Sequence, residues 1–116
     1  MGPVSSPYRI AMVESGGWGG IGHYTYNLSS ALSARGHRVS LITGRPYELA
    51  GLPRGFDLRD SLEAEAPYPE KLDEVARALR IFRPHVVHVQ STFSARRDWL
   101  PILALRLLGT PVGLTA

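Results

Sequence analysis

Apolar and polar residues are distributed along the chain in blocks that predict strands and helices in turn. Three short, mostly apolar runs, Arg9–Val13, Val39–Thr43 and Val86–Gln90, have the length and the bounding residues of buried strands. From Ile21 to Arg35 apolar residues recur every three or four positions, which predicts a helix that Gly36 ends. The predicted apolar face of this helix consists of Ile21, Tyr24, Leu28, Ala31 and Leu32. We therefore expect these side chains, Tyr24 included, to lie in the core.

The region from 44 to 69 is rich in proline and glycine, and it predicts a long irregular connection with one short strand at Phe56–Leu58. The spacing of apolar residues then predicts a second helix over Glu70–Arg83. Acidic residues come early in this segment and arginines come late, an order that complements the helix dipole. Pro84 stops the helix, because proline cannot continue the hydrogen-bonding pattern.

A third helix and a further strand are predicted near the end of the chain. Asp98 suits the N-cap of a helix that runs to Leu108, and Val112–Ala116 begins the next strand. The helical segment Trp99–Leu108 is apolar nearly all round, so we expect the chain to be able to self-associate through it. Strands that alternate with helices predict an α/β fold with a mainly parallel sheet. The ligands of such a fold collect at the carboxyl ends of its strands.

Composition narrows the classes of function. The 116 residues are 44% hydrophobic and 20% charged, which is enough for one domain and too little for two. The formal charge is only +3 and acids are interleaved with bases, which argues against nucleic acid as a partner. The absence of cysteine excludes thiolate chemistry and disulfides. The N-terminus does not resemble a signal peptide, and the longest apolar stretch is too short to cross a membrane.

The strongest chemical signal is a glycine-rich turn between the first strand and the first helix. Five of the 12 glycines lie between Ser15 and Gly22. Glycine permits positive φ angles and lets a ligand approach bare backbone N–H groups at a helix N-terminus, where anions are favoured. The turn is therefore a candidate phosphate cradle. The alternative is a tight connection that binds nothing, as in a non-enzymatic interaction domain.

The turn is compatible with more than one phosphate ligand. Gly17, Gly19 and Gly22 fit the spacing of a dinucleotide fingerprint. The second strand is followed by Arg45 and by no acid, so an NADP-binding oxidoreductase of the short-chain-dehydrogenase kind stays open, with Arg45 at the 2′-phosphate. A P-loop is excluded, because no Gly-Lys-Ser/Thr follows.

A second resemblance covers nearly the whole chain. Gly19-Gly-Ile-Gly-His-Tyr24, the later Arg35-Gly-His-Arg-Val39 and the strand after it are similar to the opening of glycosyltransferase family 4. Pro84-His-Val-Val-His-Val-Gln90 and Gly109-Thr-Pro-Val-Gly-Leu-Thr115 resemble later strands of the same N-terminal domain. A match of several separated segments in the same order identifies a family more specifically than a match of one glycine-rich string does. The resemblance implies a Rossmann-like sheet within a GT-B architecture, with 1–8 as a flexible N-terminus and 9–116 as a partial, acceptor-side domain.

The resemblance also implies an activity. Family members transfer a sugar from a nucleotide-sugar donor to an acceptor hydroxyl with retention of configuration, and they need no cofactor or metal. It implies that the donor diphosphate approaches Gly19 and Gly20, and that the catalytic residues and the donor-binding C-terminal domain lie outside this chain. The isolated piece would then be inactive. The expected location is cytoplasmic, with a peripheral membrane contact allowed in the full-length protein.

Further candidates for contacts with the acceptor, a small molecule, glycan or lipid, follow from position. They are Trp18 and His23 beside the turn, and Gln90, Ser91 and Thr92 at a strand's carboxyl end. His23 stands where the family commonly has arginine. His88 lies within a buried strand and has no neighbouring ligand set at metal spacing, so we expect a hydrogen-bonded core histidine and no metal site.

Overall fold

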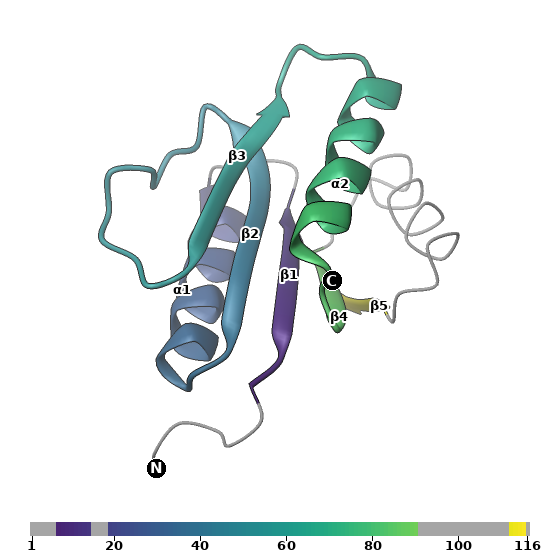
Figure 1. Ribbon diagram of the computed structural model, residues 1–116. Helices are drawn as coiled ribbons and strands as arrows, with labels where there is room; N and C mark the ends of the chain where they lie inside the picture. Colours follow the sequence, from purple (N-terminus) through teal and green to yellow (C-terminus); the bar gives the residue numbers. More distant parts are fainter. Residues whose placement is uncertain (1–6, 15–18, 91–111, 116) are drawn as a thin grey trace.

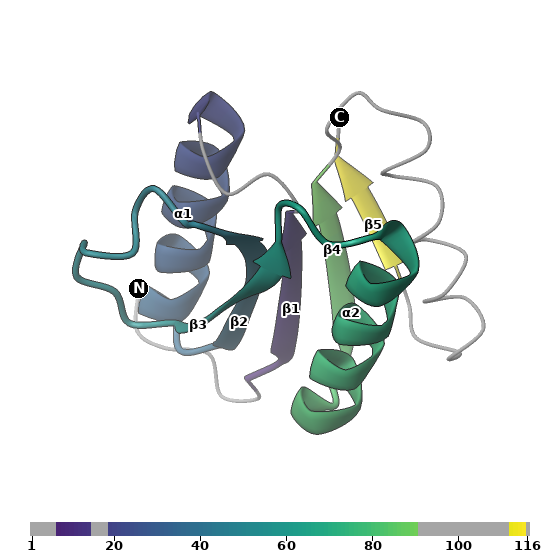
Figure 2. The ribbon, with the colours of Figure 1, turned by 90° about the horizontal axis from the view of Figure 1, so that it is seen from above.

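The computed structural model describes residues 7–14, 19–90 and 112–115. The helices and strands run in the order β1 (Arg9–Glu14), α1 (Gly19–Ala34), β2 (Arg38–Arg45), β3 (Asp57–Glu63), α2 (Tyr68–Phe82), β4 (Val86–Gln90) and β5 (Val112–Thr115). The five strands form one sheet in the order β3-β2-β1-β4-β5, and every neighbouring pair is parallel. The helices cover opposite faces of this sheet, α1 on one and α2 on the other (Figures 1 and 2). The predicted Rossmann-like α/β fold is therefore confirmed.

Two apolar clusters hold the helices to the sheet, because successive strand residues point to opposite faces. On the α2 face, Ala11, Val13 and Ile42 pack with Val75 and Leu79 of the helix. The cluster on the α1 face is made by the alternate strand residues and by the connection after β2. Its buried members are Ile10, Met12, Val39, Leu41, Tyr47, Leu49 and Phe56. Both faces are thus closed, as expected of a parallel sheet.

Local signals account for the ends of α2. Pro67 and Pro69 fix the chain at its start, where a missing N–H costs nothing, and Glu70 lies in the first turn. At its end, Arg83 adopts the left-handed conformation with φ 54° and donates its N–H to the carbonyl of Leu79 at 2.8 Å. Pro84 follows directly. The helix therefore starts two residues earlier than the sequence predicts and ends one residue earlier.

Two histidines, one just before β2 and one just before β4, accept hydrogen bonds from the backbone at the start of β1. His37, just before β2, accepts a hydrogen bond at Nδ1 from the backbone N–H of Tyr8 at 3.1 Å. His85, just before β4, accepts the next N–H, that of Arg9, at 2.9 Å. Tyr8 also stacks on the ring of His37. These contacts hold together the amino-terminal ends of β1, β2 and β4.

Candidate functional site

The order of the strands reverses between β1 and β4. From β1 the chain first adds β2 and β3 on one side and then β4 and β5 on the other. In open α/β sheets, ligands bind beyond the carboxyl ends of the strands that flank such a reversal. Glu14 ends β1, Gln90 ends β4, and the glycine-rich segment leads from Glu14 into α1. The carboxyl edge at this point is therefore the candidate functional site.

Three buried polar side chains lie in a row across this edge. Glu14 is in register with Thr43 of β2, and Val13 is in register with Val89, so that Gln90 continues beside Glu14. All three are buried. The alternation along each strand turns them toward the α1 face, where Ile10, Leu41 and Val86 precede them. We call Thr43, Glu14 and Gln90 the polar row.

The carboxylate of Glu14 is the least expected member of the polar row. Only 1% of the residue is exposed. The hydroxyl of Thr43 donates a hydrogen bond to its Oε2 at 3.2 Å. Burying a carboxylate costs free energy unless hydrogen bonds compensate for the lost water, and charge-assisted hydrogen bonds are among the strongest in proteins. Glu14 therefore adds a buried carboxylate, which can accept several hydrogen bonds, to the candidate site.

Tyr47 is buried on the same face of the sheet as this carboxylate. It follows β2 by two residues, and its ring belongs to the cluster on the α1 face. Burial raises the pKa of Tyr47 to about 12, and the negative charge of Glu14 and the neighbouring Tyr26 act in the same direction, while Arg54 opposes them. The phenol is consequently a neutral hydrogen-bond donor throughout the physiological range.

Helix α1 meets the carboxyl edge with small and polar residues. Gly19 and Gly20 are its first two residues, so their N–H groups are among those that no helical carbonyl accepts. Further along, Gly22, Thr25 and Ser29 are buried, and the Thr25 hydroxyl donates to the carbonyl of Gly22 at 3.1 Å. The first turn thus combines orphan donors with the positive end of the helix dipole, a combination that favours anions.

Among the described residues, the strand positions next to Glu14 and Thr43 on the other face of the sheet are apolar. Where Glu14 and Thr43 occupy the α1 face, the neighbouring Val13 and Ile42 face α2 and pack with Leu62 and Val75. In the described part of the chain, five of the six buried polar residues lie on the α1 side, the exception being Ser40. Buried polar groups at the carboxyl edge are therefore gathered on the side of the glycine-rich turn.

The structure places some of the predicted site residues. Gly19 and Gly20 open α1, Gln90 is buried at the reversal point, and His23 is exposed on the first turns of α1. The remaining candidates lie outside the described residues: Trp18, Ser91, Thr92 and the helix predicted over Trp99–Leu108. The roles assigned to these residues in ligand binding stay predictions.

Two expectations about single residues are wrong. Tyr24 was expected in the core and is 46% exposed, because α1 turns its small residues Gly22, Thr25 and Ser29 toward the sheet. Small side chains let a helix approach a sheet closely, and they leave Tyr24 on the outer side. For His88 we expected a hydrogen-bonded core histidine. Its Nε2 is buried and has no hydrogen-bond partner in the described part of the structure.

Arg45 bears on the dinucleotide alternative. Its guanidinium pairs with the Glu63 carboxylate at 2.8 Å and donates from Nε to the carbonyl of Asp60 at 3.0 Å. Both partners belong to β3. The cation proposed for a 2′-phosphate is thus occupied in linking the ends of two neighbouring strands, and a phosphate would have to compete with Glu63 for it.

Sequence reasoning gave Glu14, Thr43 and Tyr47 no role of their own, although each bounds a loop that follows the carboxyl end of a predicted strand. In the sequence, Glu14 and Thr43 are polar residues at the ends of apolar strands, and Tyr47 belongs to the segment predicted to be irregular. Only the pairing of β1 with β2 brings the first two together, and only the packing of the connection after β2 buries the third. One usable signal was present: a single acid directly after the apolar strand β1 and directly before the glycine-rich turn.

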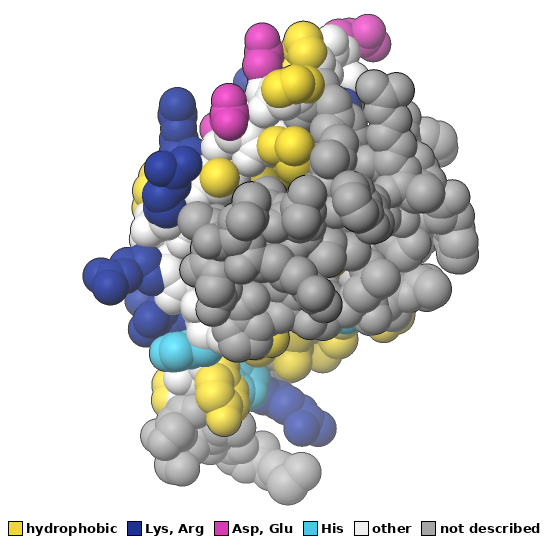
Figure 3. Space-filling view, turned by 90° about the vertical axis from the view of Figure 1, so that its right-hand side faces the viewer, with side chains coloured by type: hydrophobic (Ala, Val, Ile, Leu, Met, Phe, Trp, Pro, Cys, Tyr) yellow, Lys and Arg dark blue, Asp and Glu magenta, His cyan; other side chains and the backbone are white. Residues whose placement is uncertain are grey.

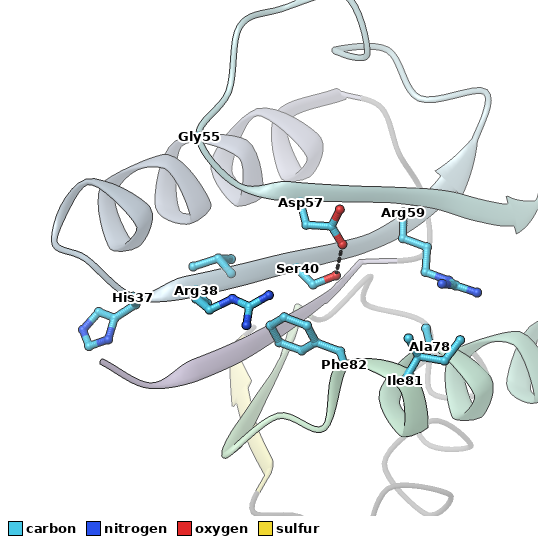
Figure 4. Close-up of a pocket in the computed structure, with 10 residues that line it drawn as sticks. His37, Arg38, Ser40, Gly55, Asp57, Arg59, Ala78, Ile81 and Phe82 are labelled. Carbon is cyan, nitrogen blue, oxygen red and sulfur yellow. Dashed lines mark hydrogen bonds between the residues drawn. The ribbon is translucent and has the colours of Figure 1, made fainter. Parts of the chain in front are cut away.

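A groove of about 540 Å³ lies at the other end of the sheet (Figure 4). It runs between the beginnings of β2 and β3 and the end of α2, and Arg38, Asp57 and Phe82 are among its lining residues. Two of its polar side chains have partners: Ser40 donates to Asp57 at 3.1 Å, and Arg59 pairs at 2.9 Å with Glu74, which lies outside the lining. Thr43, Glu14 and Gln90 do not line the groove, so it is separate from the polar row.

Charged side chains of both signs lie on the surface of the described residues. Lys and Arg side chains gather along one margin of the face in Figure 3, with acidic side chains above them. The exposed side of α2 likewise mixes signs, with Glu70 and Asp73 followed by Arg77 and Arg80. Among residues 7–14, 19–90 and 112–115 no cluster of His, Asp and Glu could hold a metal ion, and neither helix has the length and apolar character needed to span a bilayer.

Comparison with known proteins gives a family and a fold. The family model described as Glycosyltransferase Family 4 matches residues 18–116. A similar solved structure is the C-terminal domain of a hydrogenase from Pyrococcus furiosus, with 14% sequence identity and a TM-score of 0.57 over 99% of this chain and 98% of that one. At this identity the likeness concerns the fold alone. The search of curated proteins found no match.

Proposed function

This chain belongs to glycosyltransferase family 4, and from that premise we propose that it forms the acceptor-side part of an enzyme that transfers a sugar from a nucleotide-sugar donor to an acceptor hydroxyl. The polar row carries the proposal. A glycosyl acceptor must be held by hydrogen bonds, and Thr43, Glu14 and Gln90 supply buried hydrogen-bonding groups beside the glycine-rich turn. A sheet edge that served only as a connection would be stabilised by apolar residues there, as on the α2 face.

The two parts of the site have different tasks in this proposal. Gly19 and Gly20 offer the unpaired N–H groups of the first helical turn to the donor diphosphate. Negative charge builds up on that diphosphate as the sugar leaves, and preorganised N–H donors stabilise it. The polar row lies at the carboxyl ends of β1, β2 and β4 and holds the acceptor. By the resemblance to the family, transfer proceeds with retention, without a metal or cofactor, and with the catalytic groups on a second domain.

Titration calorimetry with UDP-glucose, GDP-mannose and NADPH tests the proposal. We expect weak binding of a sugar nucleotide, because this chain would supply only part of the donor site. Gly20→Ala should weaken that binding about tenfold, since a Cβ beside the N–H groups keeps the diphosphate at a distance. Gly51→Ala is the matched control, because a Cβ at Gly51 meets no atom within 4 Å.

The competing outcome is equally clear. Tight NADPH binding that Arg45→Ala abolishes, with no response to either sugar nucleotide, would replace the transferase by a dinucleotide-binding oxidoreductase.

A further inference from the structure

The groove at the amino ends of β2 and β3 has two unlike walls (Figure 4). The wall formed by the sheet is polar and charged, with Arg38 and Ser40 from β2 and Asp57 and Arg59 from β3. The wall formed by α2 is apolar and consists of Ala78, Ile81 and Phe82. A concave space of about 540 Å³ that combines an apolar wall with a few polar groups is typical of sites for small molecules.

Arg38 supplies this groove with a cation that has no partner in the described part of the chain. Its backbone N–H donates to the carbonyl of Tyr8, but its exposed guanidinium makes no hydrogen bond or ion pair with a described residue. Arg59, the other arginine of the groove, is paired with Glu74 at 2.9 Å. A guanidinium presents a planar fork of N–H donors that matches a carboxylate. Arg38 is therefore the group at which an anion would bind.

Asp57 supplies a carboxylate that is oriented by the fold and keeps one oxygen available. The hydroxyl of Ser40, a residue that is only 2% exposed, donates to Oδ2 of Asp57 at 3.1 Å. The second oxygen, Oδ1, has no partner among the described residues. Asp57 and Arg38 form no ion pair with each other, although both line the groove. The groove thus presents a separate anion and a separate cation.

The apolar wall exposes more hydrophobic surface than the fold requires. Ile81 is 66% exposed, more than any other large hydrophobic residue in the described part of the chain. Phe82 beside it is partly buried and packs against the apolar cluster on the α2 face. Removing such surface from water favours binding. An apolar ligand group is therefore expected to cover Ile81 and Phe82.

The two walls together match a ligand that carries both charges and an apolar group. A carboxylate would pair with Arg38, and an ammonium group would donate to the free oxygen of Asp57. A purely anionic ligand is repelled by Asp57, and a purely cationic one is repelled by Arg38. An α-amino acid carries its carboxylate, its ammonium group and its side chain on one carbon, so it can meet all three requirements at once.

We propose that this groove binds a free α-amino acid with an apolar side chain. Its carboxylate binds Arg38, its ammonium group binds Asp57, and its side chain lies against Ile81 and Phe82. The site goes beyond the proposed sugar transfer and does not depend on it, because none of the residues of the polar row lines the groove.

The test is an NMR titration of the ¹⁵N-labelled chain with L-phenylalanine and L-leucine. We expect at least one of them to bind and to shift the amide signals of Ser40, Asp57 and Phe82. Phenylpropionate, which lacks the ammonium group, and phenethylamine, which lacks the carboxylate, should each bind at least about tenfold more weakly, since each loses one charge-assisted hydrogen bond.

Two variants test the charged groups one at a time. Arg38→Gln and Asp57→Asn should each weaken binding of the amino acid about tenfold. Asparagine at position 57 can still accept the hydrogen bond from Ser40, so the wall keeps its arrangement. Arg35→Gln is the matched control, because Arg35 is an exposed arginine that does not line the groove, and it should leave binding unchanged.

Three results would overturn the inference. The first is that neither amino acid binds the parent chain. The second is that phenylpropionate or phenethylamine binds as tightly as the amino acid, which would mean that only one of the two charges is recognised. The third is that Arg38→Gln binds the amino acid as well as Arg35→Gln does.

Discussion

Replacing Ser29 by alanine should make the protein more stable. Ser29 is 0% exposed on the sheet-facing side of α1, and its hydroxyl has no hydrogen-bond partner in the described structure. A buried hydroxyl without a partner costs about 1–3 kcal/mol, and alanine is also the better helix former by roughly 0.5 kcal/mol. Because alanine leaves only a small void, we expect Ser29→Ala to raise the free energy of unfolding by about 0.5–2 kcal/mol.

Urea denaturation followed by circular dichroism measures this change directly. Ser33→Ala is the matched control on the same helix, because the Ser33 hydroxyl donates to the carbonyl of Gly55 at 2.8 Å. There the loss of a hydrogen bond worth about 1 kcal/mol outweighs the gain in helix propensity, so stability should fall slightly. A loss of stability in Ser29→Ala larger than that in Ser33→Ala would refute the reasoning, since it would mean that the Ser29 hydroxyl has a favourable partner.

Two further predictions concern a buried hydrogen bond and an ion pair. Thr43→Val should lower the free energy of unfolding by about 1–3 kcal/mol, because it removes the hydroxyl that donates to buried Glu14, and Thr43→Ser should restore most of the loss in the same urea experiment. The pKa of Glu74 lies below its ordinary value of 4.5: burial acts to raise it, but the paired Arg59 guanidinium, 2.9 Å away, outweighs burial. A depressed pKa in the folded state gives stability that is present above 4.5 and is lost as the pH falls through the lower, folded value. The pair is partly exposed, so this contribution should be about 0.5–1 kcal/mol. Glu74→Gln should remove that part of the acid destabilisation in urea curves recorded across this pH range, and an unchanged pH dependence would contradict the assignment.

The sequence predicted most reliably those elements whose apolar positions follow a clear strand or helix spacing. Val86–Gln90 was predicted with the bounds that β4 has, and β1 and α2 differ by one or two residues at their ends. The strand β3 was predicted only as Phe56–Leu58, whereas it runs from Asp57 to Glu63. It lies at the edge of the sheet, and charged residues are common on edge strands, so it lacks the apolar run that marks a buried strand.

The candidate site was predicted in position but not in composition. The glycine-rich turn and Gln90 could be found because strand ends and glycines are local signals. The polar row could not, because Glu14 and Thr43 are 29 positions apart and meet only through the pairing of β1 with β2. The sheet-facing side of α1 was misassigned for a related reason: apolar spacing selects Tyr24, whereas close packing against the sheet selects Gly22, Thr25 and Ser29.

The most direct test of the central claim is to map sugar-nucleotide binding on the folded chain by NMR. If the carboxyl edge is the substrate-facing part of a family 4 glycosyltransferase, UDP-glucose or GDP-mannose should shift the amide signals of Gly19, Gly20 and Gln90. The amides of His37 and Asp57, in the groove at the opposite edge, should not move. Shifts confined to that groove, or no response to either sugar nucleotide together with binding of NADPH, would contradict the claim.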